Sequence, residues 1–340
     1  MHKPAAPVKS RAFIDRLGIA MRASHVLVLI FVLGGIVFAA FGTAMGDTFF
    51  LRLATEALIF AGLALSVDIL LGYTGLLSLG QALYFGLGAY VSALVLKQVP
   101  SFWAAMAAVL FTSLIVAFAA GLIANRVRGV YFALVTFGLA QVVAKAIYNT
   151  RALGASDGMI GVPIIPIDLG IAVVMSNAPA GFFLVVLGVI VVLYAVSAYL
   201  LDTPFGRVLV ALRANERRVP FLGYSTRSAR LAAYVIAAVV AALSGALYPM
   251  LRGFVSPELL FFSTSGNAVI TVVIGGVGTL AGALYGGVIL TVLKSVVGSI
   301  TQHHLVVIGL LFMATVIFLP KGLLGLVRPR IERLLGGRAR

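Results

Sequence analysis

Few residues in this chain could carry out chemistry on their own. Cysteine is absent, which excludes thiolate nucleophiles, thiolate metal sites and disulfides. Two of the four histidines, His2 and His25, lie near the N-terminus, and the other two, His303 and His304, are adjacent. Adjacent residues lack the i, i+4 spacing with which a helix holds a metal ion. We therefore expect no catalytic residue, no metal site and no cofactor, and we do not expect an enzyme.

The polar residues of interest lie inside apolar segments. Asp68 comes late in an apolar run, and a carboxylate at the centre of a bilayer costs about 2.5–3.5 kcal/mol to insert. Such groups usually have a role, which makes Asp68 a candidate for a translocation path. An interfacial or helix-pairing role is the alternative. Glu56, at the opposite end of the same run, is less diagnostic.

Residues 72–90 read GYTGLLSLGQALYFGLGAY, which is rich in glycine for a helix. One interpretation is a helix that packs closely against its neighbours through glycine. The other is a broken segment that lines a cavity, in which freed backbone groups and polar side chains meet a solute. The candidate path residues in this segment are Tyr73, Ser78, Gln81 and Tyr84.

A second glycine-rich segment, residues 274–287, reads IGGVGTLAGALYGG and contains six glycines. Close backbone contact, a chain reversal or a half-helix is expected there. Asn267 and Thr271 precede it by about two turns and one turn. They are candidates either for lining a path or for bonding between helices.

The elements that must position these residues are transmembrane helices. The hydrophobic fraction is 62% and the charged fraction 10%, against about 25% charged residues in an ordinary soluble domain. The mean hydropathy is +1.14. We predict an all-α polytopic transmembrane helix bundle with about ten spans (eight to ten), because apolar runs near the 18–20 residues needed to cross a bilayer recur along the chain. The predicted spans are 26–45, 53–71, 76–96, 101–124, 130–149, 180–201, 228–251, 263–281, 283–300 and 303–319.

The positive charges predict an orientation. With ten spans and a cytoplasmic N-terminus, six of the 25 Lys and Arg residues fall on or toward the outer side, and the others lie in cytoplasmic tails and loops. The six are Arg52, Lys97, Lys145, Arg151, Arg252 and Lys294. Because the charge of +15 is gathered between apolar segments, we expect contact with membrane lipid and not with nucleic acid.

The domain organisation follows from the same pattern. We predict a cytoplasmic basic N-terminal tail (1–25), a transmembrane domain (26–320) and a cytoplasmic basic C-terminal tail (321–340). The first apolar run is longer than the core of a signal peptide, so an uncleaved span is expected. The longest external connection, 150–179, carries glycine and proline turn residues and no separate domain.

One cytoplasmic loop, residues 202–230, reads DTPFGRVLVALRANERRVPFLGYSTRSAR and is more elaborate than a charged anchor requires. It mixes basic residues with apolar ones such as Leu209, Leu212 and Phe221. A short surface helix would present Arg213, Asn215 and Glu216 to a cytoplasmic partner.

This loop resembles the cytoplasmic loop of LivM-type permeases of branched-chain amino-acid ABC importers, in which a T-P-F-G-R pattern precedes A-x-R-x-N-E and a glycine. The matching residues here are Thr203, Pro204, Phe205, Gly206, Arg207, Ala211, Arg213, Asn215, Glu216 and Gly223. Further segments that are similar to the family occur in order at 72–90, 128–141, 244–257, 273–287 and 318–326.

The resemblance implies a permease subunit in the bacterial inner (plasma) membrane that forms half of a translocation path. It implies four partners: a homologous second permease of the LivH type, two cytoplasmic ATPase subunits and a periplasmic substrate-binding protein. Arg213, Asn215, Glu216 and Gly223 would then couple the loop to an ATPase. The sequence contains no Gly-Lys dipeptide and hence no Walker A loop, which agrees with ATP hydrolysis on another chain.

The sequence departs from the family pattern at Pro220, which would break a helix interior but is tolerated in a first turn. The solute stays open, because related permeases carry branched-chain amino acids, urea or short amides, or aromatic acids. An ion-coupled secondary transporter is the alternative from another class. Such a protein usually shows paired ionisable residues within its spans, and only Asp68 is a candidate here.

Overall fold

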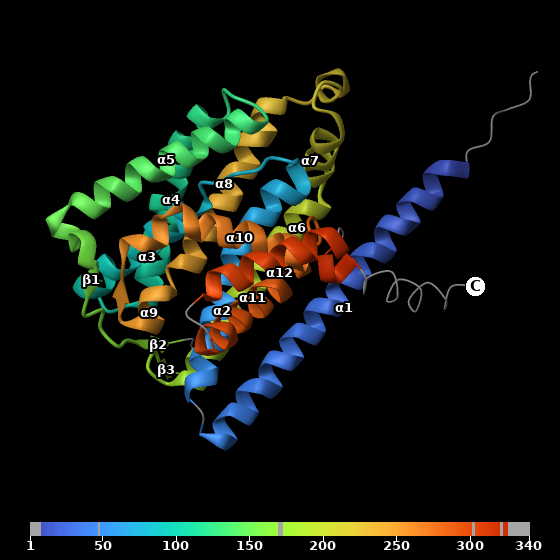
Figure 1. Ribbon diagram of the computed structural model, residues 1–340. Coiled ribbons are helices and arrows are strands. Elements are labelled where there is room, and N and C mark those ends of the chain that lie inside the picture. The colour runs from blue at the N-terminus through green and yellow to red at the C-terminus, as the bar shows by residue number, and fades with distance from the viewer. Residues whose placement is uncertain (1–7, 47, 169–172, 301–302, 320–321, 326–340) are drawn as a thin grey trace, which may run out of the picture.

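The computed structural model describes residues 8–46, 48–168, 173–300, 303–319 and 322–325, and the fold of these residues is almost entirely helical (Figure 1). Its helices are α1 (Val8–Met45), α2 (Thr48–Asp68), α3 (Gln81–Gln98), α4 (Phe102–Ala124), α5 (Val130–Asn149), α6 (Pro179–Asp202), α7 (Pro204–Asn215), α8 (Thr226–Gly245), α9 (Tyr248–Arg252), α10 (Phe262–Gly275), α11 (Ala281–Ile300) and α12 (His304–Phe318).

Each of the ten predicted apolar segments contains a helix, so the all-α class is confirmed. Within the described residues, seven helical stretches are long and apolar enough to cross a membrane: residues 25–45, 48–74, 102–124, 130–149, 179–202, 226–252 and 281–300. The segments predicted at 76–96, 263–281 and 303–319 form α3, α10 and α12, which do not meet that standard of length and hydropathy. The chain is therefore a multi-pass membrane protein, and the count of ten stays a prediction.

Helix α1 begins at Val8, so the predicted N-terminal tail is helical from that residue onward. The part of α1 with the composition of a membrane span begins at His25, close to the predicted boundary. Residues 1–7 and 326–340, which hold much of the two predicted basic tails, lie outside the described residues.

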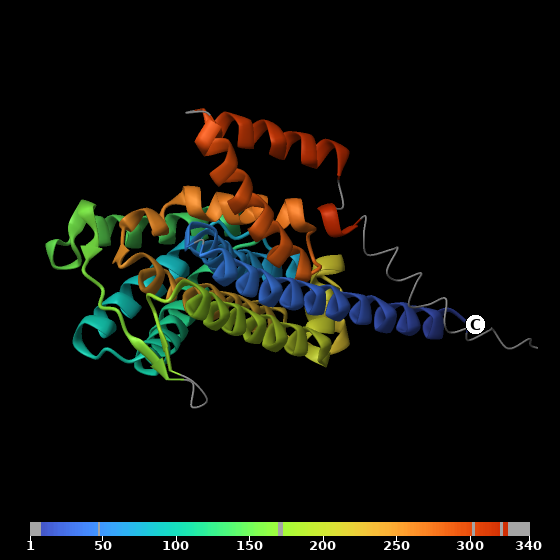
Figure 2. The same cartoon turned by 90° about the horizontal axis from the view of Figure 1, so that it is seen from below.

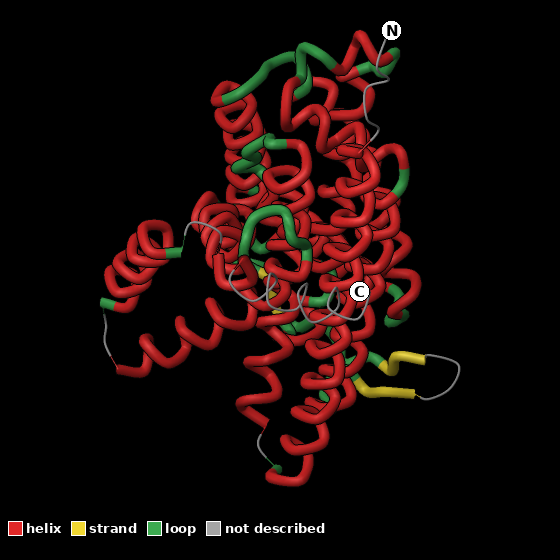
Figure 3. Tube along the Cα trace, turned by 90° about the vertical axis from the view of Figure 1, so that its right-hand side faces the viewer, coloured by secondary structure: helices red, strands yellow, loops and turns green. Residues whose placement is uncertain are grey.

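The centre of the bundle is formed by α2, α3 and α8. In the span that contains α2, 78% of the most apolar window is buried, against 22% for the span of α1, so α2 is a core helix and α1 a peripheral one. Glycines allow close approach between α3 and α8, because a Cβ on Gly88 would collide with the Ala242 carbonyl and one on Gly245 with the Phe85 carbonyl. Figure 2 shows that α12 and the far end of α11 stand away from the other helices, and Figure 3 shows how much of the described chain is helical.

Short elements make the chain reversals. The strands are β1 (Met159–Ile160), β2 (Pro166–Asp168), β3 (Val173–Met175) and β4 (Phe254–Val255), paired β1 with β4 and β2 with β3, both antiparallel. The short helical turns are the π-helix η1 (Ile69–Thr74) and the 3-10 turns η2 (Arg151–Leu153), η3 (Ala155–Asp157), η4 (Val219–Leu222) and η5 (Pro257–Leu260). The described part of the predicted external connection 150–179 thus contains turns and the strands β1, β2 and β3.

The chain reversals lie at two ends of the bundle, which we call the strand end and the α7 end after the elements found there. At the strand end, the Trp103 indole donates to the Asp168 carbonyl (2.9 Å) and the Val162 amide to the Gly253 carbonyl (3.0 Å). At the α7 end, the loop 202–230 meets the turn between α4 and α5, the end of α2 and the turn between α10 and α11. Figure 1 shows α7 and the strands on opposite sides of the molecule.

Candidate functional site

The loop 202–230 folds into a short helix that lies against the bundle. Pro204 occupies the first turn of α7, where its missing amide costs nothing, and Gly206 is so close to α6 that a Cβ would collide with the Leu201 carbonyl. Leu209 and Leu212 lie on the inner face of α7 and are buried. The apolar face of α7 therefore fixes the loop against α6, α8 and the end of α2.

Arg213 joins α7 to the end of α2. Its guanidinium Nη1 donates a hydrogen bond to the carbonyl oxygen of Gly72, which lies in η1. This π-helical turn continues α2 and ends at Gly75, whose φ of 72° is left-handed. π-helical turns inside longer helices are frequent at functional sites.

Asp68 joins the end of α2 to the turn between α10 and α11. Its side chain is fully buried, and its two oxygens accept hydrogen bonds from the Gly278 amide (Oδ1, 2.6 Å) and the Leu280 amide (Oδ2, 2.8 Å). These contacts agree with the helix-pairing interpretation of Asp68, and its place on a translocation path stays a prediction. Both of its oxygens are occupied by the chain itself.

The turn that Asp68 holds, residues 276–280, has an unusual backbone. Gly276 and Gly278 have φ values of 119° and 80°, and Leu280 has a φ of 49°, which is rare for a residue with a side chain. Such conformations persist where the surrounding structure holds them in place. The two hydrogen bonds to Asp68 supply that constraint, and the positive φ values explain the glycines at Gly276 and Gly278.

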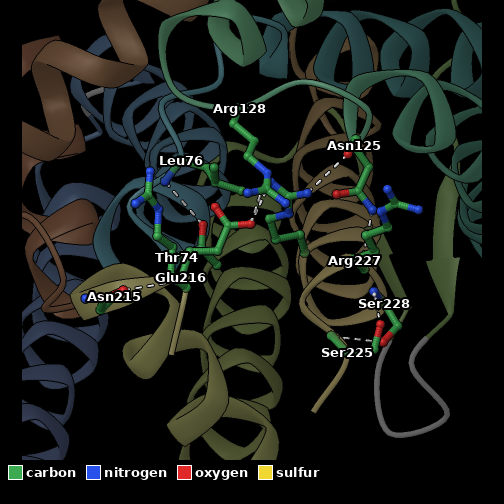
Figure 4. Close-up of polar contacts among 11 residues, drawn as sticks. Thr74, Leu76, Asn125, Arg128, Asn215, Glu216, Ser225, Arg227 and Ser228 are labelled. Carbon is green, nitrogen blue, oxygen red and sulfur yellow. Dashed lines mark hydrogen bonds and ion pairs between the residues drawn. The ribbon is translucent and has the colours of Figure 1, made fainter. Parts of the chain in front are cut away.

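Glu216 joins the loop to two further elements (Figure 4). Its Oε1 lies 3.2 Å from Nη1 of Arg230 and 3.5 Å from Nε of Arg128. Arg230 is buried in the second turn of α8, and its Nη2 donates to the Asn125 carbonyl (3.2 Å). The Asn125 amide nitrogen donates in turn to the Arg227 carbonyl (2.6 Å). The charged groups of the loop thus bind it to the turn between α4 and α5 and to the start of α8.

The four predicted coupling residues therefore divide into two kinds. Arg213 and Glu216 contact the bundle and position the loop. Asn215 and Gly223 are exposed: the Asn215 Oδ1 accepts from the Arg217 amide (3.1 Å, Figure 4), and Gly223 ends η4 with a φ of 82°.

Beside Gly223 lies an exposed apolar patch, which we define as Phe221, Leu222 and Tyr224, with exposed fractions of 90%, 66% and 50%. These residues lie outside every candidate membrane span. Pro220 is in the first turn of η4, where the sequence predicts that it is tolerated, and α7 has already ended at Asn215. The proline thus lies within the 3-10 turn that presents the patch, outside α7.

The predicted path residues at the start of α3 lie in the core. The chain is not helical from Gly75 to Gly80, so the predicted break in 72–90 is present in its first part, while α3 packs closely; that the break lines a translocation path stays a prediction. Ser78 and Gln81 are buried, and Ser66 Oγ donates to Gln81 Oε1 (3.4 Å). Tyr73 is half-buried at the end of η1.

Deeper in α3, the Tyr84 hydroxyl donates to the Tyr234 hydroxyl (3.0 Å), and both side chains are buried. On α10, Thr271 is buried and its hydroxyl donates to the carbonyl of Asn267 (2.8 Å), while Asn267 is half-buried. These contacts bring Gln81 and Tyr84 into the bundle core but leave Asn267 and Thr271 on a separate helix.

Sequence reasoning missed the residues that connect these helices. Ser265 accepts from the Ala82 amide (2.9 Å) and so joins α10 to α3, and Thr136 accepts from the Leu79 amide (3.3 Å) and so joins α5 to the broken segment. Arg230, at the end of the basic loop 202–230, is buried. A polar residue placed among apolar ones was the available signal for Thr136, but it does not reveal the partner. Ser265 lies in the polar run STSGN and Arg230 ends the polar run STRSAR, so neither stands out in the sequence. Within the described residues, no group of three or more His, Cys, Asp or Glu side chains could hold a metal.

Known proteins are similar to most of this chain. LivM of Salmonella typhimurium (strain LT2), a high-affinity branched-chain amino acid transport system permease protein, is 29% identical over 310 residues, which is 85% of this chain and 72% of the relative. LivM of Escherichia coli (strain K12) is 28% identical over 302 residues, 82% of this chain and 71% of the relative. LivH of Salmonella typhimurium is 24% identical over 290 residues, 81% of this chain and 93% of the relative.

No solved structure matches the chain. Residues 49–316 match the family model described as "Branched-chain amino acid transport system / permease component", and this range contains both α7 and the Asp68 contact. That match covers well over half of the sequence, so the chain belongs to the family of branched-chain amino acid transport permeases.

Proposed function

We propose that the chain is a permease subunit of a bacterial ABC importer in the inner membrane, that it forms half of a translocation path for branched-chain amino acids, and that separate ATPase subunits drive it. The observation that carries this proposal is the loop 202–230. It is a preformed helix and turn, held to the bundle by Arg213 and Glu216, that exposes Phe221 outside the membrane spans. Exposed apolar patches rimmed by polar residues mark protein interaction sites.

The partners in this proposal are a second homologous permease, two cytoplasmic ATPases and a periplasmic binding protein. The similarity of this chain to both LivM and LivH relatives supports two permeases of one fold in one transporter. These relatives are branched-chain amino acid transport permeases by name, which supports branched-chain amino acids as the solute.

The orientation belongs to the same proposal: ten crossings, with both termini and the α7 end in the cytoplasm. The positive-inside rule supports it, because Arg126, Arg128 and the six arginines of the loop 202–230 all lie at the α7 end. An ATPase would then meet the patch of Phe221, Leu222 and Tyr224 from the cytoplasm.

The contacts of the carboxylates argue against the ion-coupled alternative. A secondary transporter needs ionisable groups in its spans that are free to bind an ion or proton. Asp68 accepts hydrogen bonds from two backbone amides, and Glu56 is paired with Arg252 (2.5 Å). Both carboxylates are therefore engaged by groups of the chain itself.

Reconstitution of the transporter tests the function. The chain is combined with the second permease, both ATPases and the binding protein in proteoliposomes, and uptake of labelled leucine is measured. We expect uptake that requires ATP and the binding protein. Uptake by this chain alone, driven by an ion gradient, would contradict the proposal.

Replacing Phe221 with alanine tests the docking surface. Truncation of a central aromatic in an interface typically costs about 2 kcal/mol or more, so we expect the ATPases to be lost when Phe221→Ala is purified in detergent. The matched control is Phe111→Ala in α4, a phenylalanine that is 67% exposed within a candidate span. The control should retain the ATPases; equal retention by the two variants would exclude Phe221 from the interface.

A further inference from the structure

Two hydrogen-bonded contacts connect α7 to the turn between α10 and α11 through the end of α2. We propose that Asp68 is the positioning residue of a joint that passes movement of the loop 202–230 to α10 and α11. We define this joint as the end of α2 (residues 69–75) together with the turn 276–280. This inference rests on the proposed function, because it requires an ATPase that moves the loop.

The first contact of the joint is made by Arg213. Besides bonding to the Gly72 carbonyl, the Arg213 side chain lies against both parts of the joint. A Cβ placed on Gly75 would be 3.1 Å from Arg213 Cγ, and one placed on Gly278 would be 3.2 Å from its Nη1. The end of α7 therefore touches η1 and the turn 276–280 at the same time.

The second contact is the Asp68 carboxylate itself. It lies on α2 one turn before Gly72, and it accepts hydrogen bonds from two amides of the turn 276–280, those of Gly278 and Leu280. The backbones of Gly72 and Gly278 are packed in direct contact, because a Cβ on Gly72 would lie 2.6 Å from both the Cα and the amide nitrogen of Gly278. A hydrogen bond to an ionised carboxylate is stronger than one between neutral groups, so this contact can pull the turn as well as push it.

The turn 276–280 is coupled closely to the two helices it joins. A Cβ on Gly275 of α10 would collide with the Gly282 carbonyl of α11, and one on Gly286 of α11 with the Thr271 carbonyl of α10. Close-packed interiors respond to a displacement by shifting as units and not by local compression. Displacement of the turn therefore moves α10 and α11 together.

Movement of these helices reaches the centre of the bundle. Ser265 of α10 accepts from the Ala82 amide at the start of α3, next to Gln81, and Gly287 of α11 lies against Ala61 of α2. Gln81 Nε2 is buried and has no hydrogen-bond partner among the described residues. The start of α3 therefore has an unpaired donor whose surroundings would change when α10 moves. The joint thus connects a surface loop with the broken segment in the core.

The experiment measures ATP hydrolysis and leucine uptake together in the reconstituted transporter, with wild-type chain and with Asp68→Asn. The asparagine keeps the size of the side chain but presents one acceptor and one donor to the two amides. We expect hydrolysis within about two-fold of wild type and uptake reduced at least about ten-fold, because the ATPases still close while the turn no longer follows. The matched control is Glu56→Gln, on the same helix at the strand end, which should leave both rates unchanged.

A loss of hydrolysis and uptake in equal proportion would assign Asp68 a purely structural role, and unchanged uptake would mean that the joint transmits nothing. Either result overturns the inference. Failure of the proposed function is distinguishable from both, since the wild-type transporter would then show no ATP-driven uptake at all.

A second measurement does not depend on activity. The chain lacks cysteine, so spin labels can be attached at Val277→Cys in the turn and Ile160→Cys at the strand end. We expect ATP to change the distance between the labels in the otherwise wild-type transporter and to leave it unchanged with Asp68→Asn. An equal change in both would overturn the inference.

Discussion

The two ends of the bundle hold their chain reversals in different ways. At the α7 end, buried Asp68 and buried Arg230 bind backbone groups far away in the sequence, and Glu216 connects the loop to two other elements. At the strand end, strands of two or three residues pair, and the main ion pair, Glu56 with Arg252, has an arginine side chain that is 45% exposed. The difference indicates that the α7 end moves as one piece, whereas the strand end can open locally.

The largest effect expected from this comparison is that of Glu216→Lys. It leaves the Arg230 side chain, which is only 5% exposed, beside a like charge instead of a carboxylate. Breaking a buried ion pair costs about 3–5 kcal/mol, and the lower end applies here because Glu216 is itself 26% exposed. We expect a strongly lowered melting temperature in detergent and loss of ATP-driven uptake.

Glu216→Gln is the matched variant, since it keeps the size of the side chain and one acceptor for Arg230. It should be intermediate between wild type and Glu216→Lys in both measurements. Wild-type stability of Glu216→Lys would contradict a role of this carboxylate in holding the loop.

A smaller effect is expected from Gly72→Ala. The added methyl would meet Asp68 Oδ1 and the backbone of Gly278, and forcing extra volume into a close-packed contact costs about 1–3 kcal/mol. The control is Gly138→Ala in α5, where a Cβ would meet nothing within 4 Å. Thermal unfolding of the two purified variants should show a lower midpoint for Gly72→Ala alone. Equal midpoints would mean that the α7 end is looser than the contact distances indicate.

The smallest effect is expected at the strand end, from Glu56→Gln. The pair with Arg252 is partly exposed, and exposed ion pairs contribute about 0–1 kcal/mol. The unfolding midpoint should change little, and it should depend weakly on salt in wild type. A loss as large as that of Glu216→Lys would remove the distinction between the two ends.

The positions of the helices could be predicted from the sequence, because a helix in lipid needs a long apolar run and charged residues and glycines separate these runs. The short helix in the loop 202–230 could be predicted because the apolar residues of the loop exceeded what an anchor needs. The partners of Asp68 could not be predicted, since Gly278 is 210 positions away and the pairing depends on how α2 and α11 pack. The burial of Arg230 could not be predicted for the same reason. An arginine between spans is expected to be solvated, and only the fold places Glu216 and the Asn125 carbonyl beside its guanidinium group.

The order of the loop 202–230 has a consequence for assembly. Arg213 and Glu216 already hold α7 and η4 in place in the isolated chain, so the entropy of fixing this segment is lost during folding and not on association. A surface that is ordered beforehand binds with a smaller entropic penalty. An ATPase that docks on Phe221 would therefore meet a finished surface, and the permease could recruit it without first waiting for a loop to fold.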